Sequence, residues 1–98
     1  MDAQTLFRLI PTGSHNALKR PKNLNTDRAL RRLIEEANNS GDIIINNGKG
    51  YFRPDLNNPY DRLEYQTYIN SKKSRIRSLA ESVIAMERAA QEYNQLCL

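Results

Sequence analysis

The chain has 98 residues, a formal net charge of +4 and 39% hydrophobic residues. A chain of this length holds one compact domain with an appendage, and its positive charge suits an anionic partner. The single cysteine, Cys97, excludes a disulfide within the chain. No apolar run approaches the ~18 residues that a membrane-spanning helix needs. The N-terminus lacks a basic segment ahead of its apolar residues, so we expect no signal peptide.

The first 25 residues predict two short helices and a connector. Asp2 is a suitable N-cap for the first helix. This helix would turn four apolar side chains inward: Leu6, Phe7, Leu9 and Ile10. Residues 11–13 end it, and Ser14 can cap a second helix of at most two turns within residues 14–20. Pro21 closes that segment because proline removes a backbone donor.

The clearest predicted element is an amphipathic helix that starts at Thr26 as its cap. At 100° per residue, five apolar side chains share one face: Ala29, Leu30, Leu33, Ile34 and Ala37. The opposite face carries Arg28, Arg31, Arg32, Glu35 and Asn39. Gly41 suits the left-handed conformation that often ends a helix.

A β-hairpin is predicted directly after this helix. The β-branched run at 43–45 favours a strand, and Asn47-Gly48 is a strong turn signal because both residues tolerate positive φ. Residues 51–53 form the returning strand, which Pro54 ends. We expect Tyr51 and Phe52 to be core residues beneath the hairpin rather than platforms for stacked bases.

One long helix is predicted from Pro59 to about Asn94, since no proline or glycine follows Pro59. Its distal half has a heptad pattern typical of a coiled coil. The expected dimerisation seam comprises Ile69, Ile76, Leu79, Val83, Met86, Ala90 and Tyr93, with Cys97 as a further position and Lys72 as the one break. The alternative is a helix packed on its own domain. The helix is basic early and acidic later, which favours an antiparallel pair.

The sequence offers no constellation for catalysis. His15 is the only histidine and lies far from Cys97 in sequence, which argues against a Cys–His pair or a histidine-containing zinc site. The glycines around Lys49 lie between two predicted strands, whereas a phosphate-binding loop lies between a strand and a helix. We therefore expect no enzyme activity, no metal site and no cofactor.

Basic residues instead indicate nucleic-acid binding. Between Lys19 and Arg32 there are six basic residues and one acid, and such residues supply most non-specific affinity for DNA. A basic helix followed by a glycine-tipped hairpin is the order of parts in a winged helix. The candidate DNA-binding residues are Lys19, Arg20, Lys22, Arg28, Arg31, Arg32, Lys49 and Arg53. The alternative is that Arg31 pairs with Glu35, and Arg32 with Glu36, to stabilise the helix.

Three stretches resemble small winged-helix proteins of Firmicutes phages and prophages: residues 9–20, 26–37 and 44–52, the last reading Ile-Ile-Asn-Asn-Gly-Lys-Gly-Tyr-Phe. The segment 61–90 also resembles their C-terminal helix. The resemblance implies a mainly α fold with a small β-hairpin wing, namely a winged helix-turn-helix over residues 1–56 and a long helix over 57–98. It implies a regulatory protein that binds double-stranded DNA in the bacterial cytoplasm and has no enzyme activity.

The segment before the basic helix departs from this pattern, because residues 21–25 replace a longer helix-turn segment. Phages also use small winged helices to bind host proteins, including nucleic-acid-guided defence enzymes. The second interpretation is therefore a protein-interaction or inhibitor module that acts on a host nucleic-acid enzyme such as a defence nuclease.

Overall fold

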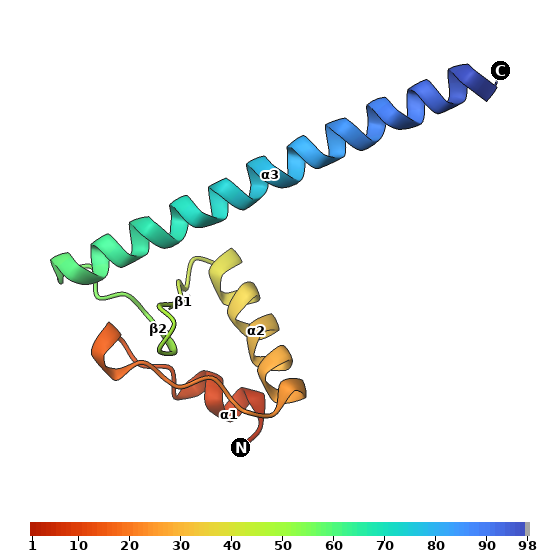
Figure 1. Ribbon diagram of the computed structural model, residues 1–98. Coiled ribbons are helices and arrows are strands. Elements are labelled where there is room, and N and C mark those ends of the chain that lie inside the picture. Colours follow the sequence, from red (N-terminus) through yellow and green to blue (C-terminus); the bar gives the residue numbers. More distant parts are fainter. Residues whose placement is uncertain (98) are drawn as a thin grey trace. The chain divides into compact units, whose positions relative to one another are not determined.

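The computed structural model describes residues 1–97 of the backbone and the side chains of residues 1–94. It is mainly helical and contains one small antiparallel hairpin (Figure 1). The elements are α1 (Ala3–Arg8), a 3₁₀ turn (Ser14–Asn16), α2 (Leu24–Asn39), β1 (Ile45–Asn46), β2 (Tyr51–Phe52) and α3 (Pro59–Cys97). The expected class, mainly α with a small hairpin and a long C-terminal helix, is confirmed.

Two compact units divide the chain, Met1–Tyr68 and Ile69–Leu98. The first includes the opening turns of α3, so it extends past the expected boundary at residue 56. Asp61, in the first turn of α3, is fully buried and accepts a hydrogen bond from the Asp55 N–H at 2.9 Å, which ties the start of this helix to the preceding linker. The first unit therefore contains α1, α2, the hairpin and the first turns of α3.

Helix α1 begins where the sequence predicts. The Asp2 carboxylate accepts a 2.8 Å hydrogen bond from the Thr5 N–H. Leu6 and Phe7 are partly buried and Ile10 is buried. Leu9, however, is 51% exposed. Its predicted inward position was wrong because the helix already ends at Arg8 and Leu9 serves as its C-cap.

The predicted helix within residues 14–20 shrinks to a single 3₁₀ turn. After it, Leu18 pairs with Tyr51 of β2, and each N–H donates to the other's carbonyl at 2.8 Å. Thr12 forms a parallel bridge to Arg53. The weak helical pattern failed because extended backbone here satisfies the free edge of the hairpin.

Helix α2 starts three residues earlier than expected, at Leu24. Asn23, not Thr26, is the cap, and its side chain accepts from the N–H groups of Asn25 and Thr26 at 2.9 and 3.1 Å. Leu30 and Ile34 are buried. Ala29 is exposed, so the apolar face is narrower than predicted.

The end of α2 agrees with the sequence. Gly41 adopts φ 93°. The N–H of Gly41 donates to the Asn38 carbonyl, and that of Asp42 donates to the Ala37 carbonyl at 2.9 Å. This is the Schellman arrangement, in which a left-handed glycine lets the chain turn back and satisfy the last carbonyls.

The hairpin pairs Ile45 with Phe52 and Asn46 with Tyr51. Its strands are shorter than predicted, because pairing begins only at Ile45. The turn has positive φ at Gly48 and Gly50 but not at Asn47. The side chains of Asn46 and Asn47 instead accept from the Gly48 and Lys49 N–H groups at 2.8 and 3.0 Å, respectively, as asparagine does in Asx turns.

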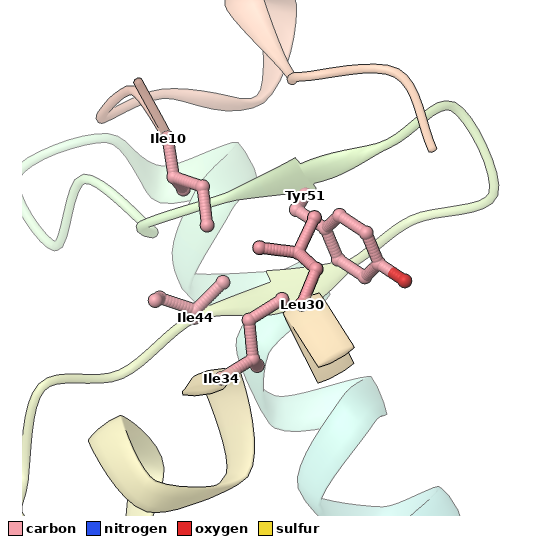
Figure 2. Close-up of a cluster of buried hydrophobic side chains, with 5 residues drawn as sticks. All are labelled: Ile10, Leu30, Ile34, Ile44 and Tyr51. Carbon is pink, nitrogen blue, oxygen red and sulfur yellow. The ribbon is translucent and has the colours of Figure 1, made fainter. Parts of the chain in front are cut away.

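The core lies where α2 meets the hairpin and the end of α1. Figure 2 shows its five buried side chains, Ile10, Leu30, Ile34, Ile44 and Tyr51. Phe52 and Ile45 are fully buried as well. The expectation that Tyr51 and Phe52 belong to the core is confirmed, and neither ring is available to stack on a base.

Helix α3 begins at Pro59, as predicted, and the Asn58 side chain accepts from the Tyr60 N–H at 2.9 Å. Every described side chain from 70 to 94 is exposed. Within the described residues, no helix is both long enough and apolar enough to cross a membrane.

Candidate nucleic-acid interface

Asp27, the only acid in the basic stretch 19–32, does not face outward. It is 4% exposed and lies on α2 beneath the hairpin. Its carboxylate accepts from the Arg20 guanidinium at 2.8 Å and from the Tyr51 hydroxyl at 2.9 Å. Arg31 Nε lies 3.3 Å from the same carboxylate. The fold therefore removes this negative charge from the surface of the stretch.

The hydrogen-bond partners of Asp27 explain why the pKa of its carboxyl group is lowered. The hydrogen bond from Arg20 is the main reason that the pKa of Asp27 is lowered, with Tyr51 and Arg31 adding to it against the opposing effect of burial. Burial, and next the bond to Asp27, raise the pKa of Tyr51. Asp27 is thus ionised and Tyr51 protonated at neutral pH, the states that this hydrogen bond requires.

Arg20 and Arg31 are held by Asp27 but remain accessible. Their side chains are 50% and 56% exposed, respectively. Arg31 therefore pairs with Asp27, four residues before it, rather than with Glu35, four residues after it. No ion pair joins Arg32 to Glu36 among the described residues, so the interpretation of these arginines as helix-stabilising partners of the two glutamates does not apply.

Five further candidates are exposed and form no ion pair within the part of the chain that the structure describes. They are Lys19, Lys22, Arg28, Arg32 and Lys49. Arg28 and Arg32 lie one helical turn apart on α2 and so share a face. Lys19 and Lys22 lie in the connector that leads into α2, and Lys49 lies in the hairpin turn.

Close backbone packing brings the hairpin turn to the connector. A Cβ atom added at Gly50 would lie 2.2 Å from the Leu18 carbonyl oxygen and 3.1 Å from the Lys19 nitrogen. Lys49 precedes Gly50, so its backbone lies beside that of Lys19. The next residue, Arg20, is tied to α2 through Asp27. The hairpin turn, the connector and α2, which carry the basic residues, are therefore held together within the first unit.

Arg53 has a different environment from the other candidates. Its guanidinium donates to both carboxylate oxygens of Asp42, at 2.8 and 3.0 Å, and to the Ile10 carbonyl at 2.8 Å. It also lies 5.7 Å from the centre of the Phe7 ring. Hydrogen bonding to Arg53 lowers the pKa of Asp42. We assign Arg53 to holding α1, the end of α2 and β2 together.

Two polar contacts of the first unit were not predicted from the sequence. One is the Asp27–Tyr51 bond. The other is Asn38, whose amide accepts from the Ile44 N–H at 2.6 Å and donates to the Ile44 carbonyl at 3.1 Å. The spacing of Asp27 and Arg31 was a usable signal for an ion pair. Nothing local pointed to Tyr51, because it lies 24 residues from Asp27 in the sequence.

The expected dimerisation seam lies on the second unit, apart from the basic surface in sequence. Five of its residues have exposed fractions between 47% and 69%: Ile76, Leu79, Val83, Met86 and Tyr93. Ala90 is exposed and Ile69 is half-buried. Cys97, the further position, lies beyond the described side chains.

No group of three or more His, Cys, Asp or Glu side chains suited to a metal ion occurs among the described residues. No protein-family model, curated protein or solved structure matches this chain.

Proposed function

We propose that this chain binds double-stranded DNA as a small winged-helix regulator of the phage type. The observation that carries the proposal is the burial of Asp27, which leaves the basic stretch without an outward-facing acid. Arg28 and Arg32 on α2 face the duplex and contact its phosphates. Lys19, Lys22 and Lys49 contact phosphates beside the helix.

The number of exposed basic residues sets the expected salt dependence. Five phosphate contacts give a slope of log affinity against log salt of about −4.5 per protomer. A fluorescence-anisotropy titration with a labelled duplex between roughly 50 and 200 mM salt measures it. Affinity that stays constant over this range would contradict the proposal.

A charge-matched pair of variants separates a specific surface from general charge. R28A/R32A should reduce the steepness of the slope by about 1.8, since each phosphate contact contributes about 0.9. R77A/R88A removes the same charge from exposed positions of α3 and should leave the slope unchanged. Equal losses in both variants would show that α2 is not the binding face. Enrichment of one sequence from a random duplex library would establish that bases as well as phosphates are read.

A protein-interaction or inhibitor module is the second candidate. It is favoured by Leu24, which is 78% exposed in the first turn of α2 and shares a face with Arg28. Residues 9–23 also contain no α-helix, which favours it because standard groove insertion uses a scaffold helix before the recognition helix. If no duplex binds at low salt, but the chain inhibits a host nuclease and L24A abolishes inhibition, this second function is correct.

A further inference from the structure

We propose that two copies of this chain pair through α3 in an antiparallel coiled coil whose two-fold axis passes beside Glu81. The starting observation is that every described side chain of the second unit from residue 70 onward is exposed, including the apolar seam residues from Ile76 to Tyr93. A helix of this kind gains most of its stability from packing an apolar face. The occupant must therefore bring a matching heptad seam, which a second copy does.

The charge distribution along the helix selects the orientation. The proximal part carries Lys72, Lys73, Arg75 and Arg77, and the distal part carries Glu81, Glu87 and Glu92 with Arg88. In a parallel pair, each seam residue faces its own copy, which sets Lys72 against Lys72 inside the seam. An antiparallel pair instead sets the basic part of one helix against the acidic part of the other.

The seam also fixes the register. Aligning Ile76 with Met86 of the second copy aligns Leu79 with Val83 and Ile69 with Tyr93. The same alignment sets Lys72 against the small Ala90, which leaves room for the lysine stem to run outward to water. All eight seam positions from 69 to 93 are then used, and six of the eight layers are wholly apolar.

Ion pairs beside the seam agree with this register. Lys73 and Glu87 occupy equivalent flanking positions, and such positions face each other in an antiparallel pair, so the Lys73–Glu87 contact forms twice. Sliding one helix by a heptad in either direction sets Lys73 against Ala80 or Asn94. It also leaves Ala90 and Tyr93, or Ile69, without a counterpart in the seam. Only the proposed register combines the full seam with both ion pairs.

Disulfide trapping in the full-length chain tests the orientation. In a C97S background, I76C and M86C are made separately, one carrying a small tag, and the two are mixed and oxidised. We expect the mixed dimer to cross-link, because these residues face each other. Neither variant alone should cross-link, since the two copies of residue 76 are about 15 Å apart along the axis, beyond the reach of a disulfide.

A cross-link of I76C with itself would show a parallel pair and overturn the proposal. So would sedimentation of the unmodified chain as a monomer or as an assembly larger than a dimer. These outcomes are independent of DNA binding, which the salt titration decides separately.

Charge reversal tests the register. K73E and E87K should each weaken dimerisation roughly tenfold at low salt, and K73E/E87K should restore it. The two residues lie about 21 Å apart in one helix, so the restoration can arise only between copies. R77E and E81K, which make the same charge changes on the outer face, should have little effect. If K73E/E87K dimerises as weakly as the summed effects of K73E and E87K predict, this register is wrong.

Discussion

The Tyr51 hydroxyl donates a 2.9 Å hydrogen bond to the Asp27 carboxylate and so joins the hairpin to α2 across 24 residues of sequence. Both residues are buried. Arg20 meets the same carboxylate from the connector. One buried acid thus positions three segments of the first unit and turns the basic stretch toward solvent.

Removing this bond should destabilise the fold. Y51F should lower the free energy of unfolding by about 1 kcal/mol, and D27N by about 1–3 kcal/mol because it also loses the charged partners. Urea unfolding measures both. E35Q, at an exposed carboxylate of the same helix, is the control and should change stability little. Wild-type stability in D27N would show that the buried carboxylate contributes nothing net.

The lowered pKa of Asp27 predicts a pH-dependent contribution. The folded pKa lies below the unfolded value of about 3.9. The stabilisation is therefore fully present above that unfolded value and is lost as the pH falls through the folded pKa. The stability difference between wild type and D27N should be largest near neutral pH and should shrink below pH ~4. A difference that stays constant down to about pH 3 would mean that Asp27 does not titrate differently in the folded state.

Gly50 should not tolerate a side chain. G50A would set a Cβ 2.2 Å from the Leu18 carbonyl oxygen, so the Leu18–Tyr51 bridge must open. Gly48 has a positive φ but open space around it, and G48A should cost only about 1–2 kcal/mol of conformational strain. Thermal unfolding should rank G50A well below G48A. The reverse order would contradict the close approach of the turn and the connector.

Asn38 should matter more than its neighbour Asn39. N38A leaves the N–H and carbonyl of Ile44 without their side-chain partner and should cost about 2 kcal/mol. N39A changes an exposed residue of the same turn and should cost much less. Urea midpoints of the two variants provide the comparison, and equal midpoints would argue against a role for the Asn38 amide.

Arg53 should affect stability without affecting DNA affinity. R53K loses the two-pronged contact with Asp42, because a lysine ammonium cannot reproduce the planar fork, and should cost about 1 kcal/mol. R53Q removes the charge, and the salt slope of DNA binding should still be that of the wild type, because Arg53 is engaged by Asp42 and the Ile10 carbonyl rather than by phosphates. A shallower slope of log affinity against log salt would indicate that Arg53 contacts a phosphate.

Much of the secondary structure could be predicted because its signals are local. Asp2 and Asn58 cap helices through their own following N–H groups, and Gly41 ends α2 through its own φ. The long C-terminal helix follows from an uninterrupted run without proline or glycine. The predicted start of α2 was wrong because Asn23 and Thr26 are both suitable N-cap residues, and the helix uses Asn23.

By itself, the sequence determined the three α-helices, the glycine-containing turn, the basic stretch and the heptad seam, since each depends on residues close together in the chain. Only the tertiary structure decided that residues 17–18 are extended, that Asp27 is buried and that Arg53 is engaged within the fold. These features depend on partners far along the chain, such as Tyr51 for Asp27, 24 residues away, and Ile10 for Arg53, 43 residues away. No local spacing encodes such pairings, because they form only when the hairpin packs on α2.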